Sequence, residues 1–138
     1  MYSTTVETRA TARAIRVLGR TKVGELIKQA EVFACRDIAG TSYWSDHSWG
    51  AAVDLFPAGL AAMHAERRRE IAHAAVYQAT HRTRPNRFRK LAVRYVIDHD
   101  ARAIWTPAQG WHPYTGTTGD HVHVSTGKAP SGTPPCAR

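Results

Sequence analysis

The histidines of this chain that could do chemistry lie in two short segments, one before the middle of the chain and one near its end. The later segment reads Asp120-His121-Val122-His123-Val124. If it forms a strand, its side chains alternate between the two faces of a sheet, so His121 and His123 point the same way and both valines point into an apolar core. Two imidazoles about 7 Å apart on one strand face can line one pocket. An isolated His-x-His is more often a surface pair, so this motif alone is a weak signal.

The earlier segment favours a metal site. It contains His47, followed by Asp54 in a run of small and apolar residues between Val53 and Leu55. A carboxylate in such a position is costly to bury without a partner. Backbone hydrogen bonds or an arginine could supply that partner, but a metal ion shared with His47 explains the position more economically. One carboxylate and two imidazoles would give three protein ligands and leave a fourth position for water, as in catalytic rather than structural zinc sites.

The two segments together resemble a known family. The run Ser45-x-His47-x-x-Gly50-x-Ala52-x-Asp54 resembles the Ser-x-His-x-x-Gly-x-Ala-x-Asp motif of the M15 zinc metallopeptidases. That group includes D-Ala-D-Ala carboxypeptidases and phage L-alanyl-D-glutamate endolysins. His121-Val122-His123 resembles the second motif of the group. Segments from Tyr95 onward are also similar to actinobacterial and actinophage members, so the resemblance covers about residues 31 to 127.

The resemblance implies a fold and a set of roles. The fold would be α+β, a small antiparallel sheet with flanking helices, as in D-Ala-D-Ala peptidases, lysostaphin-type peptidases and the hedgehog signalling domain. His47, Asp54 and His123 would bind zinc, and His121 would contact the substrate or the oxyanion. Asp120 matches the carboxylate that serves as general base in some carboxypeptidases of the group. Other members place a Glu in a Glu-x-x-Trp-His segment that this chain lacks, so Asp120 is the acidic candidate near the second motif.

Three further residues are predicted to bind or position the substrate. Ser45 is expected to orient a metal ligand or the nearby loop, as groups behind metal ligands do. Arg36 could hold a substrate carboxylate through a bidentate contact, and an ordinary surface position is an equal alternative. Trp111 could wall the cleft together with other aromatic residues beside the motifs, although packing is the better expectation for any one of them. These other residues are Trp44, Trp49 and Tyr114.

Helices and antiparallel strands must position these residues. Helical spacing of apolar residues predicts helices over about 21–32 and 58–81, and weakly within 1–20. Apolar or alternating runs predict strands at 32–35, 51–56, 91–97, 103–105 and 120–125. Loops are expected at 37–49 and 109–119, and His99, in a hairpin turn, and His112, in a loop, are expected to be solvated.

Length and composition fit a single domain. The chain has 138 residues, and we expect one domain over 1–127 and a flexible tail over 128–138. No stretch approaches the roughly 20 apolar residues of a membrane helix, and the N-terminus lacks the apolar run of a secretory signal. Cys35 and Cys136 are too few for a disulfide framework. A bridge between them can form, but two free thiols are the favoured prediction.

The formal net charge of +8 favours a polyanionic partner, which could be nucleic acid, an anionic membrane or an acidic wall polymer. The basic connector 82–90 could touch such a wall polymer. The resemblance narrows the choice, because it implies zinc-dependent hydrolysis of a peptide bond in the stem peptide or cross-link of bacterial peptidoglycan. The expected protein is a monomeric, bacteriolytic enzyme at the cell wall, a phage endolysin or virion-associated lysin without specific nucleic-acid or membrane partners.

Two other functions remain as alternatives. A non-catalytic zinc-binding module of the same fold would have no reason to retain Asp120 and His121. A metal-dependent nuclease is less favoured, because nucleases that use histidine and a metal need a different ββα motif, and no strand interleaves aromatic and basic residues as RNA-binding sheets do. Which peptide bond is cut does not follow from the sequence.

Overall fold

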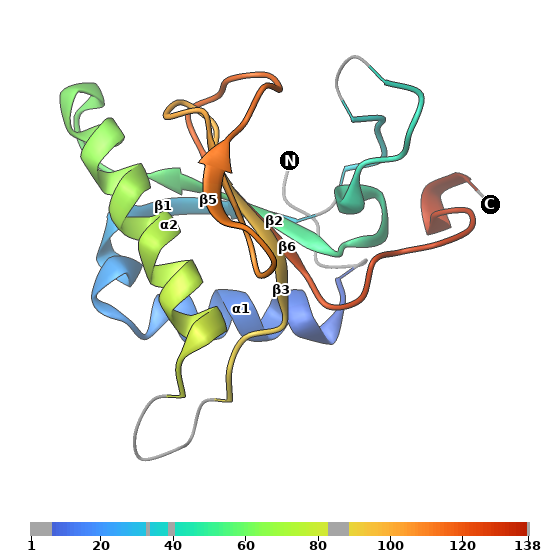
Figure 1. Ribbon diagram of the computed structural model, residues 1–138, viewed down its shortest axis with the longest axis horizontal. Coiled ribbons are helices and arrows are strands. Elements are labelled where there is room, and N and C mark those ends of the chain that lie inside the picture. Colours follow the sequence, from blue (N-terminus) through green and yellow to red (C-terminus); the bar gives the residue numbers. More distant parts are fainter. Residues whose placement is uncertain (1–6, 33, 39–40, 83–88, 138) are drawn as a thin grey trace.

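A computed structural model describes residues 7–32, 34–38, 41–82 and 89–137 (Figure 1). Over these residues the protein is α+β, with two α-helices and one six-stranded antiparallel sheet in the order β1-β2-β6-β3-β4-β5. The helices are α1 (Arg9–Gly19) and α2 (His64–Thr80). The strands are β1 (Ile27–Glu31), β2 (Ala52–Pro57), β3 (Val93–Asp98), β4 (Ala103–Thr106), β5 (Gly110–Pro113) and β6 (Val122–Thr126).

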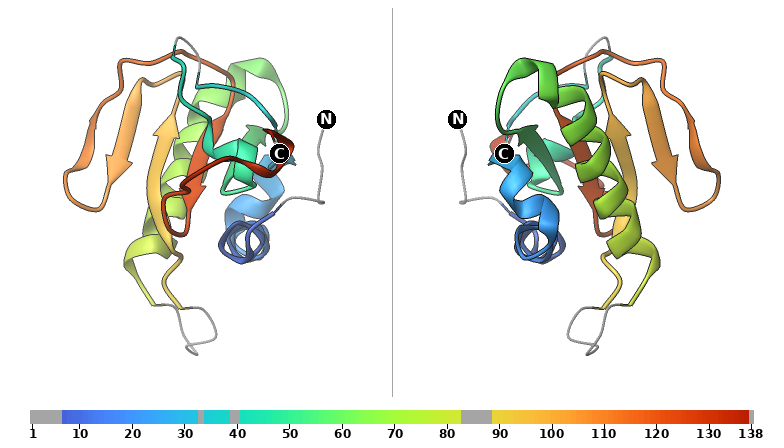
Figure 2. Two further views of the ribbon diagram at one scale, coloured as in Figure 1. Left: turned by 90° about the vertical axis from the view of Figure 1, so that its right-hand side faces the viewer. Right: turned by 90° about the vertical axis from the view of Figure 1, so that its left-hand side faces the viewer.

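Both helices pack on one face of the sheet, where the core lies. Leu18 of α1 and Ile71 of α2 are fully buried against Leu55 and Val122 of the central strands. Figure 2 shows β4 and β5 (orange) at the opposite end of the sheet from α1 (blue). Because side chains alternate along a strand, the residues between these core positions must point to the other face. The core therefore determines which residues of β2 and β6 point to the opposite face of the sheet, where a functional site can form.

The register of the sheet brings together the residues that the sequence analysis singled out. Asp54 of β2 lies directly opposite His123 of β6, and His123 also lies opposite Ile97 of β3. These strand pairings join segments that are far apart in the sequence. Helix α1 precedes the sheet in the chain, and its N-cap residue Thr8 accepts a hydrogen bond from the backbone N–H of Thr11.

Several predicted elements are confirmed within a few residues of their expected bounds. The strands predicted at 51–56, 91–97, 103–105 and 120–125 correspond to β2, β3, β4 and β6, and the long helix is α2, which begins at His64. No helix in the described ranges is long and apolar enough to cross a membrane. Within the basic connector 82–90, residues 83–88 lie outside the described residues.

Other predicted elements are wrong. Instead of a helix over 21–32, the chain forms the 3₁₀ turn η1 (Lys22–Leu26) and then β1, which pairs with β2. The strand expected at 32–35 is absent from its described residues, with Phe33 outside them. The loop expected at 109–119 contains β5, in which Trp111 pairs with Trp105 of β4. For β1 and β5, pairing with a neighbouring strand outweighs the local pattern.

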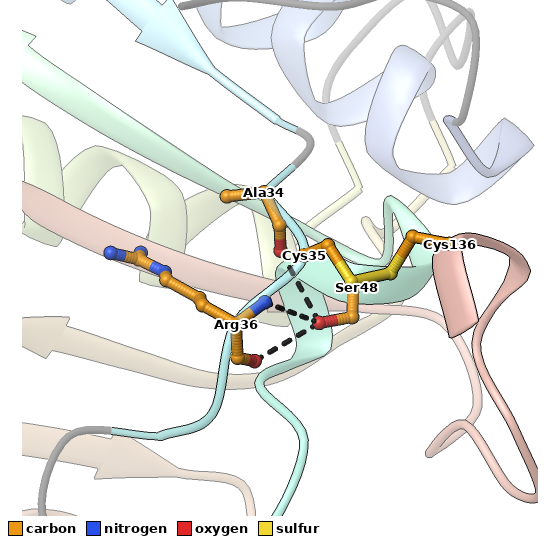
Figure 3. The surroundings of a disulfide bond; sticks show 5 residues. All are labelled: Ala34, Cys35, Arg36, Ser48 and Cys136. Atoms are coloured by element: carbon orange, nitrogen blue, oxygen red, sulfur yellow. Dashed lines mark hydrogen bonds between the residues drawn. A yellow bond between two sulfur atoms is a disulfide. The ribbon is translucent and has the colours of Figure 1, made fainter.

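The two cysteines form a disulfide, which corrects the prediction of free thiols. Cys35 and Cys136 are 101 residues apart in sequence, and their Cα atoms lie 6.0 Å apart (Figure 3). Beside the bridge, the Ser48 hydroxyl accepts from the backbone N–H of Arg36 at 3.2 Å and lies within 3.2 Å of the carbonyls of Ala34 and Arg36. The bridge therefore fixes one point of the segment predicted to be a flexible tail. The composition of that segment could not reveal the contact, since it depends on where distant residues meet.

Candidate metal centre

Three side chains from three elements converge on the face of the sheet opposite the helices. His47 comes from the 3₁₀ turn η2 (Asp46–Trp49), Asp54 from β2 and His123 from β6. Asp54 Oδ1 lies 3.1 Å from both His47 Nε2 and His123 Nδ1, and these two nitrogens are 3.2 Å apart. All three residues are buried. The chain thus contains a buried group that could hold a metal ion, as the sequence predicted.

The dimensions of this triangle fit a tetrahedral ion. Ligand atoms about 2.0–2.2 Å from a zinc ion, at the corners of a tetrahedron, are roughly 3.3–3.6 Å apart. The three distances between His47, Asp54 and His123 are only a few tenths of an ångström shorter. A small outward movement of the side chains would therefore admit an ion, with the fourth corner left for another ligand.

Hydrogen bonds behind the histidines point their lone pairs at the centre. The Nδ1 atom of His47 lies 2.7 Å from the carbonyl oxygen of Val32, which can only accept, so Nδ1 carries the proton and Nε2 the lone pair. The hydroxyl of Ser125 donates to Asp46 Oδ2 at 2.7 Å, so its oxygen accepts from His123 Nε2, also at 2.7 Å. The Nδ1 atom of His123 therefore carries a lone pair. Such outer partners select the tautomer that a metal ligand needs.

Asp46 anchors this outer layer. It accepts from the Tyr95 hydroxyl at 3.0 Å and pairs with Arg94 Nη2 at 3.0 Å. Burial raises the pKa of Asp46, but the hydrogen bond from Ser125 and the charge of Arg94 outweigh burial and leave this pKa below its ordinary value. Burial, together with the negative charge of Asp46, raises the pKa of Tyr95 to about 12, so its hydroxyl remains a donor. Asp46 was not singled out from the sequence.

The protonation states complete a donor set for a cation. Burial raises the pKa of Asp54, but its close contacts with His123 and His47 outweigh burial and leave this pKa well below its ordinary value, so the carboxyl is ionised. Burial lowers the pKa of His123, which keeps its imidazole neutral. The site therefore combines one carboxylate with neutral imidazole, the forms in which these groups bind metals.

A hollow of about 420 Å³ opens beside the three residues, and two further histidines line it. His121 points the same way as His123, as predicted, and its Nε2 lies 3.6 Å from Asp54 Oδ1. The rings of His99 and His121 are 4.4 Å apart between centroids. Burial lowers the pKa of His121 to about 4, so this imidazole is neutral at physiological pH.

His99 is the residue of this hollow that sequence reasoning missed. It was expected to be solvated, but only 8% of it is exposed. Its Nδ1 donates to the carbonyl of Thr117 at 2.7 Å, and its Nε2 has no hydrogen-bond partner among the described residues. The alternation along β3 could have found it, because Ile97 lies opposite His123 and His99 follows two positions later on the same side.

Of the three residues predicted to bind or position the substrate, two lie at this hollow and one lies elsewhere. Arg36 and Ser45 both line the hollow. The guanidinium of Arg36 is half exposed and lies 3.4 Å from Asp54 Oδ2, whereas Ser45 begins η2 by accepting from the His47 backbone N–H at 3.3 Å. Trp111 does not line it and stacks instead on His73 of α2, with ring centroids 5.3 Å apart. Trp111 thus packs against α2, as was expected for any one of these aromatic residues, whereas Tyr114 lines the hollow.

Asp120 is not brought to the three converging side chains. One of its oxygens lies 2.9 Å from His64 Nδ1, and the other pairs with Arg68, both on α2. The predicted general-base role would require this side chain to leave Arg68 and turn toward the hollow. Arg68 is buried and also pairs with Asp100 at 2.8 Å.

Comparisons of the chain with models of known families, with curated proteins and with solved structures found no match. The function must therefore be argued from the two sequence motifs and from the geometry of the site.

Proposed function

We propose that this protein is a zinc-dependent peptidase that hydrolyses a peptide bond in the stem peptide or cross-link of bacterial peptidoglycan, as a phage endolysin or virion-associated lysin. The observation that carries the proposal is the triangle of His47, Asp54 and His123 beside a hollow that holds two more imidazoles. A six-stranded antiparallel sheet with helices on one face is compatible with the hedgehog and D-Ala-D-Ala-peptidase type of fold.

The donor set supports zinc. Two imidazole nitrogens and one carboxylate oxygen are common zinc ligands, and three protein ligands with one open corner are typical of catalytic zinc. His47 and His123 donate hydrogen bonds to the Val32 carbonyl and the Ser125 hydroxyl, and such partners orient the histidine ligands of metals. A zinc ion bound here would lower the pKa of a water molecule and polarise the scissile carbonyl.

The two other histidines of the hollow supply the remaining chemistry in this proposal. His99 Nε2 carries a lone pair, since Nδ1 is the donor to Thr117, and is suited to accept a proton from the attacking water. Neutral His121 can donate a hydrogen bond to the oxyanion that forms on the substrate. Arg36, half exposed at the hollow, can bind a substrate carboxylate.

The disulfide supports a place of action outside the reducing cytoplasm. Structural disulfides persist in oxidising surroundings and are rare where thiols are kept reduced. The Cys35–Cys136 bridge lies immediately before Arg36 and beside the η2 turn that carries His47. A protein that meets the wall after release or from a virion would work in such surroundings.

The experiment is hydrolysis of defined muropeptides by the zinc-loaded protein, with products identified by mass spectrometry. We expect cleavage at one type of peptide bond, and no cleavage by the metal-free protein. His99→Gln and His121→Gln should keep the metal and lose roughly 10²–10⁴-fold in turnover. His73→Gln, on the outer side of α2, is the matched control and should behave as the parent protein.

The same experiment separates the alternatives. Stoichiometric zinc with no hydrolysis of any muropeptide would indicate a non-catalytic zinc-binding module. Cutting of plasmid DNA by the loaded protein would instead indicate a nuclease. Asp120→Asn distinguishes the two candidate bases, because a large loss in that variant, with His99→Gln active, would return the role to Asp120.

A further inference from the structure

Helix α1 carries a line of arginines along its outer side. Arg9, Arg13 and Arg16 lie in the helix and Arg20 forms its C-cap, so successive arginines are four, three and four residues apart. At 3.6 residues per turn these positions share one face. The buried residues of the helix, such as Thr11, lie on the opposite side. Arg9, Arg16 and Arg20 are exposed, and α1 contains no acidic residue.

A hollow of about 300 Å³ lies beside this line, between α1 and residues 89–92. Three cationic side chains line it, those of Arg13, Arg89 and Lys90. The Arg13 guanidinium donates to the backbone carbonyls of Arg89 at 2.9 Å and Lys90 at 3.3 Å. Carbonyl oxygens hold the guanidinium in place but do not neutralise its charge. No acidic side chain of the described residues lines this hollow, so an anion would relieve the mutual repulsion of the three cations.

This surface is separate from the candidate metal centre. In Figure 1, α1 lies below the sheet and the η2 turn (teal) above it. The α1 residues Ala14 and Leu18 pack in the core, on the face of the sheet opposite Asp54 and His123. A polymer bound along α1 would therefore leave the hollow at the histidines open.

We propose that this arginine face (Arg9, Arg13, Arg16, Arg20, Arg89 and Lys90) binds a linear phosphodiester polymer of small polyol units. From Arg9 to Arg20 the helix rises roughly 16 Å, enough to follow several successive phosphates. The exposed residues of α1 itself are Arg9, Arg16 and Gly19, which offer no aromatic ring to stack on a base and no apolar side chain to enter a bilayer. The choice of a wall polymer as the source of this chemistry rests on the proposed function.

The test measures binding of poly(glycerol phosphate) to the zinc-loaded full chain across a range of salt concentrations. The variant Arg9→Gln/Arg16→Gln/Arg20→Gln removes three charges from the arginine face. The matched control Lys28→Gln/Arg69→Gln/Lys128→Gln removes three exposed charges elsewhere, so both variants fall from +8 to +5 (8 − 3 = 5). We expect the first variant to bind about 10-fold or more weakly at 0.15 M salt, with the slope of log affinity against log salt reduced by about two to three. The control should stay close to the parent protein.

Three results would overturn the proposal. Equal losses in both variants would mean that net charge alone attracts the polymer, and parent-like binding by the α1 variant would place the contact elsewhere. Tighter binding of single-stranded DNA or of phosphatidylglycerol vesicles than of poly(glycerol phosphate), lost in the α1 variant, would assign the face to those partners. Turnover of a soluble stem peptide should be the same in both variants and the parent. Loss of peptidase activity and loss of polymer binding are thus separate outcomes.

Discussion

Two clusters of charged and polar side chains lie on opposite faces of the sheet and differ in where their positive charge comes from. On the helix side, buried Arg68 pairs with Asp100 and Asp120 and lies 3.9 Å from Asp98. On the other side, Asp54 Oδ1 lies 3.1 Å from the imidazole nitrogens of His47 and His123 and 3.6 Å from that of His121. Its second oxygen faces Arg36, whose side chain is half exposed.

The difference shows how a carboxylate in this fold becomes either structural or metal-binding. A buried carboxylate needs compensation for the water it loses. The Arg68 cluster contains a permanent cation of its own, which pairs with the carboxylates around it. The Asp54 cluster combines one carboxylate with imidazoles and could hold a metal ion, which would then supply the positive charge from solution. Arg68 also forms ion pairs with Asp98, which immediately precedes His99, and with Asp120, which immediately precedes His121.

The largest expected effect is the loss of metal from the Asp54 cluster. His123→Ala removes a ligand and should weaken zinc binding by at least about 10³-fold, more than the 10–100-fold typical of an outer partner. Competition with a chromophoric chelator measures the affinity. His112→Ala, at a half-buried histidine of β5, is the control and should bind zinc normally. Unchanged zinc affinity in His123→Ala would show that the three converging side chains do not form the site.

Arg68→Met should act on stability and leave zinc stoichiometry intact. Removing the cation leaves Asp98 buried without its positive partner, which costs about 2–4 kcal/mol of unfolding free energy, less than for a fully buried cluster because Asp100 and Asp120 are more than half exposed. Urea denaturation of the metal-free protein measures it. Arg69→Met, the exposed neighbour on α2, should change little. Equal losses in both variants would contradict the structural role of Arg68.

Ser125→Ala tests the outer layer of the metal side alone. The hydroxyl that accepts from His123 Nε2 is lost, so the tautomer with a lone pair at Nδ1 is no longer selected. We expect zinc affinity to fall about 10–100-fold, or about 1.4–2.7 kcal/mol. Ser131→Ala, exposed in the C-terminal segment, serves as control in the same titration. A parent-like affinity would mean that Asp46 and Ser125 do not orient His123.

The last expected effect is a difference in the pH dependence of the two clusters. The pKa of His121 is lowered by burial from 6.5 to about 4, so between these pH values the unfolded chain binds a proton that the folded protein does not. The unfolding free energy of the metal-free protein should therefore decrease as pH falls from 6.5 to 4. Burial raises the pKa of Asp98, so this residue contributes with the opposite sign just above its ordinary pKa of 3.8.

Urea midpoints at several pH values measure this dependence, and His121→Gln isolates the contribution of the metal side. That variant should show a shallower decline between pH 6.5 and 4. An identical decline in parent and variant would mean that His121 already carries a proton in the folded protein.

Local patterns and the resemblance together found the candidate ligands. Chemistry and position singled out His47 and Asp54, the resemblance of the second motif chose His123, and strand alternation placed His121 on the same side as His123, as the structure confirms. This worked because a strand with one apolar face leaves its alternate residues on the other face, whatever the strand pairs with. The identity of the ion remains a proposal.

The tertiary structure alone decided which distant residues meet. It buried His99 beside His121, turned Asp120 toward Arg68, and joined Cys35 to Cys136 across 101 residues. It also made residues 27–31 a strand against β2, although their spacing suited a helix. These outcomes depend on sheet register and on contacts between distant segments, which the pattern of a single segment does not contain.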